Sequence, residues 1–289
     1  MNATIFVNGR ITGAAEATVP VFDHGFLYGE GVYVTLRTYH GVPFLYDRHL
    51  QRLRNSAALM ALPVPFSDDE LLTSMTRTMA AHRGLKEAYI RVLLTRGVGE
   101  LTYNPTACPV PTTVIIVKPF PEPPARTFAE GIVLSLVSVR RNHPQALNPM
   151  IKSNNLLNNA LAMQQAIGAG ADEALMCNQA GEIVECSQSN FFVVRDGAVI
   201  TPPVDAGLLP GITRAFVLDL ARELGVDARE ETIAPGDLSR VQEAFITGTT
   251  REVTPVVRVD QQSIGDGTPG PITRRLLDAF RERAALLTR

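Results

Sequence analysis

Residues 150–162 read MIKSNNLLNNALA, and they place Lys152 just before a helical pattern, ahead of an acidic and glycine-rich segment. Lys152 is one of only three lysines in the chain. A lysine is usually a solvated surface charge, so burial statistics alone give a special role a chance of about a few per cent. The positive end of a helix that begins near Asn154 raises that chance. It disfavours a further positive charge and so favours the neutral amine, which attacks carbonyl groups.

The composition is typical of an enzyme that acts on small molecules. The chain has 289 residues, 45% of them hydrophobic and 19% charged, with a formal net charge of -2. This balance gives no electrostatic reason to expect nucleic acid or an anionic membrane as a partner. Cys108, Cys177 and Cys186 form neither an even framework nor a Cys-x-x-Cys pair, so ordinary thiols in a reducing compartment are expected. With no leader pattern and no long apolar run, we expect a soluble, cytoplasmic protein.

Strand and helix patterns do not alternate strictly along the chain, which predicts an α+β fold. Residues 4–11 and a segment after the turn at His40–Gly41 are expected to pair as strands around the glycine-containing loop 22–31. Helices are expected from near Asp47 and after the capping-box pair Ser67 and Glu70. The remaining patterns are strands at 88–96, 112–118, 131–139, 189–194, 197–201 and 243–247, and helices at 156–167 and 215–225.

A proline-rich run at residues 119–124 can neither continue a strand ladder nor form the interior of a helix. We therefore expect two domains: a small N-terminal domain over 1–118, a linker over 119–125, and a large C-terminal domain over 126–289 that carries Lys152.

Two loops have features suited to an anion. Residues 207–213 read GLLPGIT and lead into an amphipathic helix, whose first N–H groups are free, and Thr213 adds a hydroxyl. For this segment alone, an ordinary loop with a capping threonine is favoured by about two to one. Gly248–Thr249–Thr250 follows a strand and could direct backbone donors and hydroxyls into a crevice, although alone it would be just a turn.

Glu185 lies between two strand-like stretches in GEIVECSQSNFFVV. In isolation such a glutamate is most often a solvated turn residue. Its interest lies in combination with a Schiff-base lysine, because a carboxylate that faces a pyridine nitrogen keeps it protonated and lets the ring accept electrons.

Together these segments resemble the fold type IV pyridoxal-phosphate enzymes, which include branched-chain aminotransferases, D-amino acid aminotransferases and aminodeoxychorismate lyases. The resemblance extends over nearly the whole chain, and the order and spacing of its motifs make it specific. The motifs are VNG at 7–9, DHGFLYGEGVY at 23–33, HLQRL at 49–53, AYIRVLLTRGVGEL at 88–101, RRNHPQALNPMIKSNNLLNNALA at 140–162, ADEALMCNQAGEIVECSQSNFF at 171–192, LLPGITR at 208–214, FITGTTREVTPV at 245–256 and GPITRRLLDAF at 270–280.

The resemblance implies a two-domain fold like that of D-amino acid aminotransferase, with pyridoxal 5'-phosphate held by Lys152 as a Schiff base. It implies that Glu185 contacts the pyridine nitrogen and that Leu209 packs against the ring. The phosphate would be held by Arg52, the backbone of Ile212, Thr213 and Thr249. The implied activity is amino transfer between an amino acid and a keto acid in a ping-pong cycle, with 2-oxoglutarate or pyruvate as acceptor, in a homodimer.

The identity of the amine donor stays open. AYIRVLLTRGVGEL, GITR and GPITR resemble compact branched-chain aminotransferases, but the family's FEGIR is replaced by Tyr33-Val34-Thr35-Leu36-Arg37, which should shrink or polarise the pocket. Strand alternation places Tyr33, Thr35 and Arg37 on one face, although these types also follow β-propensity alone. The expected substrate-binding residues are Tyr33, Thr35, Arg37, Tyr89, Arg91 and Thr250.

Two rival specificities remain within the family. Tyr33 and KSNNLL also resemble D-amino acid aminotransferases, whose Arg-x-His carboxylate trap is replaced here by Leu101 and Tyr103, so a D-amino acid or (R)-amine is one alternative. Thr35 with Arg37 also resembles aminodeoxychorismate lyases, which eliminate pyruvate.

Other classes of protein are less well supported. A nicotinamide enzyme would need Gly-x-Gly-x-x-Gly between a strand and a helix, whereas GFLYGEG at 25–31 has another spacing and no clear ribose-binding acid downstream. A P-loop and a Gly-x-Ser-x-Gly elbow are missing from the sequence, and the histidines show no metal-ligand spacing, so no metal is expected. A catalytically silent carrier or binding module on the same fold would not need Lys152 and Glu185, so the presence of both residues argues against this class.

Overall fold

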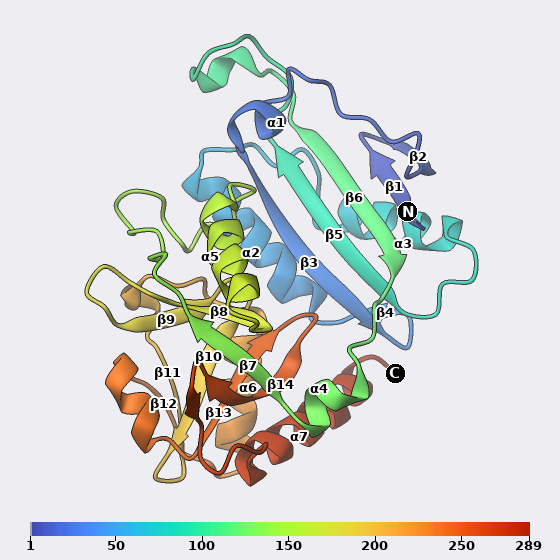
Figure 1. Cartoon of the computed structure of the whole chain (residues 1–289). Helices are drawn as coiled ribbons and strands as arrows, with labels where there is room; N and C mark the ends of the chain where they lie inside the picture. Colours follow the sequence, from blue (N-terminus) through green and yellow to red (C-terminus); the bar gives the residue numbers. More distant parts are fainter. Residues whose placement is uncertain (1) are drawn as a thin grey trace. The chain divides into compact units, whose positions relative to one another are not determined.

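The computed structural model describes residues 2–289, which divide into two compact units (Figure 1). Unit 1 contains the chain up to Pro121 together with Ile151–Asn155 and Ala285–Arg289. Unit 2 contains Glu122–Met150 and Leu156–Ala284. The break between Pro121 and Glu122 falls inside the proline-rich run, where no regular hydrogen-bond ladder can continue.

The short segment that carries Lys152 clusters with unit 1, whereas the sequence placed it with the C-terminal domain. The reason is backbone pairing with strand β3 (Gly31–Tyr39). The N–H of Tyr33 donates to the carbonyl of Lys152 over 2.9 Å, and the N–H of Asn154 donates to the carbonyl of Gly31 over 2.8 Å. Because these hydrogen bonds join residues that are far apart in the sequence, no local sequence pattern indicates them.

Unit 1 is built on an antiparallel six-stranded sheet in the order β2-β1-β6-β5-β3-β4. The strands other than β3 are β1 Thr4–Val7, β2 Arg10–Gly13, β4 Val42–Pro43, β5 Ala88–Thr95 and β6 Thr112–Pro119. The expected strand over 4–11 is in fact a hairpin, because Asn8 and Gly9 both take positive φ and form a tight turn. The strand after His40–Gly41 pairs with β3 and not with the opening strands.

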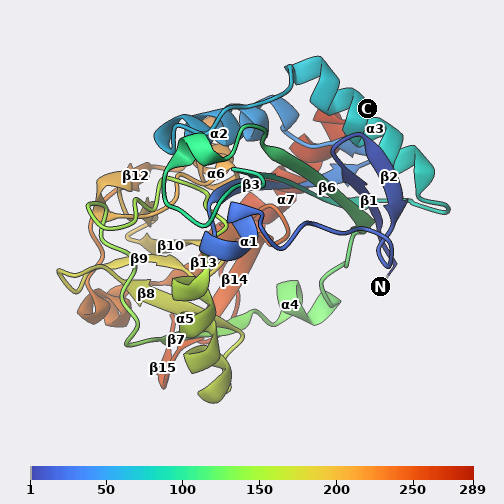
Figure 2. The ribbon, with the colours of Figure 1, turned by 90° about the horizontal axis from the view of Figure 1, so that it is seen from above.

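Alternation along β3 separates the two faces of this sheet. Val32, Val34 and Leu36 are fully buried in a core with β5 and β6, while Tyr33 and Thr35 point to the other face and are half-buried. Helices α2 (Tyr46–Leu59) and α3 (Asp68–Ala81) cover the core face (Figure 2). The predicted capping box of Ser67 and Glu70 is confirmed at the start of α3. Unit 1 also contains α1 His24–Tyr28 and the 3-10 turn η1 Pro105–Ala107.

Unit 2 contains a mixed nine-stranded sheet in the order β12-β11-β10-β13-β14-β7-β8-β9, with β15 paired to β14. A further pairing of β9 with β10 closes part of this sheet into a ring. The bounds are β7 Ile132–Leu136, β8 Glu173–Cys177, β9 Ile183–Cys186, β10 Asn190–Arg195, β11 Ala198–Thr201, β12 Ala228–Glu230, β13 Glu243–Gly248, β14 Glu252–Val259 and β15 Gln262–Ser263.

The helices of unit 2 are α4 Ala125–Ala129, α5 Leu157–Gly168, α6 Ile212–Glu223 and α7 Pro271–Leu287, with 3-10 turns η2 Val204–Ala206 and η3 Pro235–Arg240. Helix α5 begins at Leu157, one position after the start of the predicted helix at 156–167 and three positions after Asn154, which is engaged with β3. Phe216 of α6 and Phe280 of α7 pack edge to face, with ring centroids 5.6 Å apart. None of the helices in the described part of the chain combines the length and apolar composition that crossing a bilayer requires.

Candidate active site

Lys152 is held at its backbone by two different elements of unit 1. Its N–H donates to Ser56 Oγ on α2 over 3.1 Å, and its carbonyl accepts from Tyr33 on β3. Its Nζ lies 4.6 Å from the centroid of the Tyr33 ring. The amine therefore projects from a fixed backbone over an aromatic face, as a residue that must bind a cofactor at one position requires.

One face of α2 carries His49, Arg52 and Ser56, at helical spacing. Arg52 Nε is buried and has no hydrogen-bond partner among the described residues. Burial lowers the pKa of Arg52 to about 10, an effect that the nearby Tyr33 opposes, so the guanidinium is charged at neutral pH. A buried cation with an unpaired donor favours an anionic ligand, and a phosphate group fits this requirement.

The open face of the unit 1 sheet brings five of the six predicted substrate-binding residues together. In the β3–β5 register Thr35 lies opposite Arg91, and Arg37 lies opposite Tyr89. The Arg91 guanidinium stacks on Tyr33, with Cζ 3.9 Å from the ring centroid. Arg37 is only 4% exposed and packs between the rings of Tyr39 and Phe120, at 4.1 and 3.8 Å. Packing thus restrains Arg37 more strongly than the half-buried Tyr33 and Thr35.

Glu185 in unit 2 is buried and fully engaged, unlike the solvated turn residue that its type alone would suggest. Arg141 Nε donates to its Oε1 over 2.6 Å. Its Oε2 accepts from the Leu209 N–H over 3.2 Å and from Asn190 Nδ2 over 3.3 Å. An arginine and two neutral donors hold both oxygens of the Glu185 side chain in one orientation.

The start of α6 has the free N–H groups that an anion needs. Its N-cap is Gly211, which supplies no side-chain hydrogen bond, and Ile212 and Thr213 follow as buried first helical residues. Thr213 is therefore not the N-cap of α6, which the alternative interpretation of this segment as an ordinary loop with a capping threonine required. A Cβ at Gly211 would lie 1.9 Å from Asn190 Oδ1, so only glycine fits here. Asn190 also donates to the Leu209 carbonyl over 2.9 Å, which links the α6 loop to Glu185.

Thr249 and Thr250 occupy the turn between β13 and β14 and are half-buried. The turn is closed by the Arg251 N–H, which donates to the Gly248 carbonyl over 3.0 Å. Thr247 at the end of β13 lies opposite Asn190 in the β10–β13 register. Asn190 thus contacts Glu185, the Leu209 carbonyl and Gly211, the residue before Ile212 and Thr213.

Sequence reasoning did not single out four residues that shape these two groups: Arg141, Asn190, Ser56 and His49. Arg141 and Asn190 lay inside motifs that resemble the family, but only the fold shows that they bond to Glu185. Ser56 and His49 could have been found from their spacing to Arg52 on one helix face.

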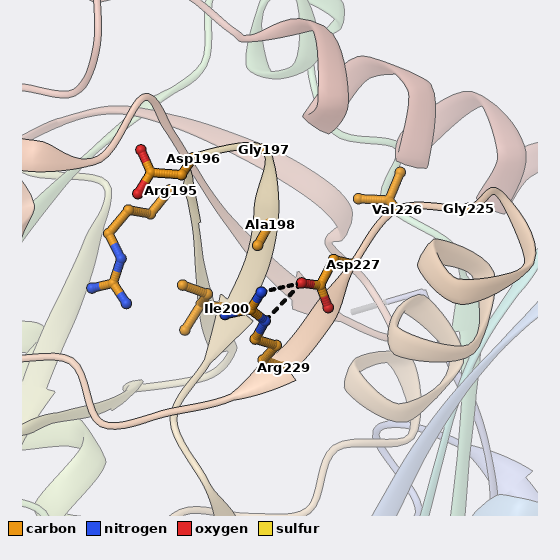
Figure 3. Close-up of a pocket in the computed structure, with 9 residues that line it drawn as sticks. All are labelled: Arg195, Asp196, Gly197, Ala198, Ile200, Gly225, Val226, Asp227 and Arg229. Carbon is orange, nitrogen blue, oxygen red and sulfur yellow. Dashed lines mark hydrogen bonds and ion pairs between the residues drawn. The ribbon is translucent and has the colours of Figure 1, made fainter.

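A pocket of about 440 Å³ lies elsewhere in unit 2, between the β10–β11 turn and the loop before β12 (Figure 3). Its lining contains none of the predicted site residues. Three of its four charged side chains pair with one another or with Glu231: Arg229 Nε donates to Asp227 over 2.7 Å, and Arg195 pairs with Glu231 over 2.8 Å. These pairs leave little unused charge for a ligand.

Comparison with known proteins gives a consistent result. Residues 31–259 match the family described as amino-transferase class IV. A Methanocaldococcus jannaschii protein provisionally named branched-chain-amino-acid aminotransferase is 40% identical over 96% of this chain and 95% of its own. The D-alanine aminotransferase of Listeria monocytogenes is 32% identical over 96% and 95% of the two chains. The structure of the Escherichia coli branched-chain amino acid aminotransferase matches at 32% identity and a TM-score of 0.92, over 100% of this chain and 96% of that one.

A further solved structure contains the amine form of a cofactor. It is a branched-chain amino acid aminotransferase with pyridoxamine 5'-phosphate, and it matches at 31% identity and a TM-score of 0.93, over 99% of this chain and 95% of that one. The fold and these matches define an aminotransferase whose cofactor is pyridoxal 5'-phosphate. The chain belongs to the class IV aminotransferase family. The fold class, the enzyme class and the cofactor predicted from the sequence are thereby confirmed.

Proposed function

We propose that this aminotransferase moves the amino group of a branched-chain L-amino acid to a 2-oxo acid such as 2-oxoglutarate, in a ping-pong cycle. The names of the similar proteins from M. jannaschii and E. coli support this donor. The observation that carries the proposal is the placement of Lys152, fixed by Ser56 and Tyr33 and directed over the Tyr33 ring.

In this proposal the residues that hold the cofactor are Lys152, Arg52, Glu185, Leu209, Ile212, Thr213 and Thr249. Arg52, the first N–H groups of α6 and Thr249 bind the phosphate. Leu209 packs on the ring, and Glu185, held by the hydrogen bond from Arg141, faces the pyridine nitrogen. When bound, the cofactor supplies an electron sink for the charge left at the substrate α-carbon.

Lys152 has a second role as the base that moves a proton away from the substrate α-carbon. A lysine suits this role when its amine is neutral at the moment of transfer. The Tyr33 ring fixes the place of this amine, since Lys152 Nζ lies 4.6 Å from the ring centroid. The same amine therefore serves for attachment and for proton transfer.

The substrate lies against the open face of the unit 1 sheet in this proposal. Tyr33, Thr35 and Arg91 surround the side chain, Arg37 and Tyr89 lie beyond them on the same face, and Thr250 helps to hold the substrate carboxylate. Thr35 adds volume where a glycine would leave space, so a smaller pocket is the expected effect.

We also propose that the protein is a homodimer that acts in the cytoplasm. The three cysteines are free and buried, as in a reducing compartment. Large apolar side chains are exposed on two segments, residues 19–26, which include the start of α1, and residues 98–110; the hydrogen bond of His24 Nε2 with the Glu100 carbonyl, 2.9 Å long, joins these segments. They are Val19, Val21, Phe22, Phe26, Val98, Leu101, Tyr103 and Val110. A patch of this kind favours burial by a second copy. Sedimentation of a monomer alone at micromolar concentration would contradict the dimer.

The test is a single-turnover reaction of the purified holoenzyme with L-leucine, D-alanine or an aromatic (R)-amine, followed by the absorbance change from the aldehyde to the amine form of the cofactor. Fast conversion by L-leucine supports the proposal. Preference for D-alanine or for the (R)-amine would replace the proposed donor. Pyruvate release from aminodeoxychorismate, without the amine form appearing, would indicate a lyase. Lys152→Ala should abolish amino transfer in every case.

A further inference from the structure

His49 is a buried titratable residue that none of the roles above uses. Its exposure is 2%, and it lies on α2 one turn before Arg52. Ser56 on the same helix face bonds to the backbone of Lys152. His49 therefore belongs to the face of α2 that carries the predicted phosphate arginine and holds the lysine segment.

The imidazole of His49 is neutral. Burial lowers its pKa well below the ordinary value, and the charges of Arg52 and Lys152 lower it further. A neutral imidazole has one N–H donor and one acceptor nitrogen. Nδ1 is buried and has no hydrogen-bond partner within residues 2–289. Buried polar atoms of this kind are rarely left unpaired, because the loss of their hydrogen bonds to water is not compensated.

The neighbours of His49 indicate what completes this bond. Arg52 and Lys152, the two charged groups that act on the imidazole, are both donors. Arg52 Nε is a second buried atom without a partner on the same helix face, as far as residues 2–289 show. Two unpaired nitrogens within one helical turn fit an oxyanion with several acceptor oxygens. The neutral imidazole of His49 would donate a hydrogen bond to such an oxyanion without adding a positive charge next to Arg52 and Lys152.

We propose that His49 donates from Nδ1 to the phosphate group of the cofactor, beside Arg52, and so positions the cofactor without contacting the reacting atoms. This inference rests on the proposed placement of the phosphate at Arg52. In this inference His49 binds the cofactor phosphate and does not merely fill space between α2 and the Lys152 segment.

The experiment measures cofactor affinity and not turnover. Apoprotein is titrated with pyridoxal 5'-phosphate and, separately, with pyridoxal, which lacks the phosphate but can still react with Lys152. The variants are His49→Phe, His49→Asn and His49→Gln, since an Asn amide can replace Nδ1 and a Gln amide replaces Nε2. His82→Phe is the matched control, because His82 is another buried histidine of unit 1 that bonds to Thr4 Oγ1 over 3.0 Å.

His49→Phe should weaken pyridoxal 5'-phosphate binding by about ten- to a hundred-fold, the size expected for a hydrogen bond to a charged group, and leave pyridoxal binding within about two-fold. His49→Asn should restore most of the affinity, and His49→Gln should not. Equal losses for both ligands, or no loss for either, would overturn the inference. If His49→Phe does not fold, the Asn and Gln variants decide, and equal phosphate-dependent affinity in the two overturns it.

These results are separable from the proposed function. Wild-type protein that binds pyridoxal 5'-phosphate through His49 but does not react with L-leucine would refute only the proposed donor.

Discussion

Arg141 and Glu185 form a buried ion pair, with Arg141 Nε 2.6 Å from Glu185 Oε1 and side-chain exposures of 9% and 6%. The other carboxylate oxygen is held by Leu209 and Asn190. A carboxylate has about four lone-pair sites, so one remains for a further donor after these three bonds. Glu185 is thus oriented by the protein and still able to accept a bond from a pyridine nitrogen.

Replacing Arg141 with leucine should destabilise the apoprotein by about 3–5 kcal/mol, because Glu185 would stay buried without its cation. Arg195→Leu is the matched control, since the Arg195–Glu231 pair is about one-third exposed on each side and should contribute at most about 1 kcal/mol. Urea unfolding of both variants measures the difference. Equal unfolding midpoints would show that the buried pair contributes no more than a surface pair.

Gly211→Ala should weaken pyridoxal 5'-phosphate binding by about ten-fold. The added Cβ would meet Asn190 Oδ1 at 1.9 Å and force a shift in the residue that holds both the Leu209 carbonyl and Glu185. Gly236→Ala serves as control, because nothing lies within 4 Å of its Cβ position. Cofactor titration of the two apoproteins gives the comparison. Unchanged affinity in Gly211→Ala would refute the link between this loop and the cofactor site.

Glu243→Gln should destabilise the protein by about 1–3 kcal/mol through the start of α7. The Glu243 carboxylate accepts from the N–H groups of Ile272 and Thr273, over 3.0 and 2.7 Å, and from the Thr273 hydroxyl. An amide keeps one acceptor oxygen and turns an NH₂ group toward the remaining donors. Asp266→Asn, in the exposed turn before α7, should change the free energy of unfolding by less than about 0.5 kcal/mol. A loss in Glu243→Gln no larger than in the control would contradict this role.

Glu173→Gln should alter the dependence of stability on pH. Burial raises the pKa of Glu173, although Ser187 and Ala174 donate to it, so the folded protein binds a proton more tightly than the unfolded chain does. This stabilisation is complete below the ordinary pKa and is lost as the pH rises through the folded-state pKa. As the pH rises above the ordinary carboxyl pKa, wild type should therefore lose stability relative to the variant, by up to about 1.4 kcal/mol per pH unit, until Glu173 is ionised in the folded protein as well. Parallel curves from urea unfolding would exclude a raised pKa.

Thr35→Gly should raise kcat/KM for L-leucine by about ten-fold, because removal of the side chain enlarges the proposed pocket opposite Arg91. Val34→Ala is the matched control on the same strand. Val34 faces the core, so its truncation should reduce stability and leave the ratio of the kcat/KM values for leucine and alanine, here called the preference, unchanged. An unchanged preference in Thr35→Gly would place Thr35 outside the substrate pocket.

Local patterns predicted much of this structure. The capping box at Ser67, the strand at Ala88–Thr95 and the alternation of Tyr33 and Thr35 with core residues depend on neighbours within a few positions. Asn8 and Gly9 also carried a hairpin signal, but a single strand was predicted there.

The remaining features depend on contacts between distant parts of the chain. Arg141 and Glu185 are separated by 44 positions, and no spacing rule joins them. Asn154 lies outside α5, and its N–H donates to the carbonyl of Gly31, far earlier in the sequence. The burial of Glu185 likewise follows from the pairing of β9 with both β8 and β10.

The closure of the unit 2 sheet links the assembly of the proposed cofactor site to the folding of the unit. Glu185 and Asn190 are the paired residues where β9 meets β10, so the seam that completes the ring also aligns the carboxylate with the donors around it. Unit 2 cannot assemble its ring without assembling this part of the proposed cofactor site. Loss of the seam by heat or denaturant should therefore abolish cofactor recognition in the same cooperative step, and the cofactor in turn should protect the seam by mass action.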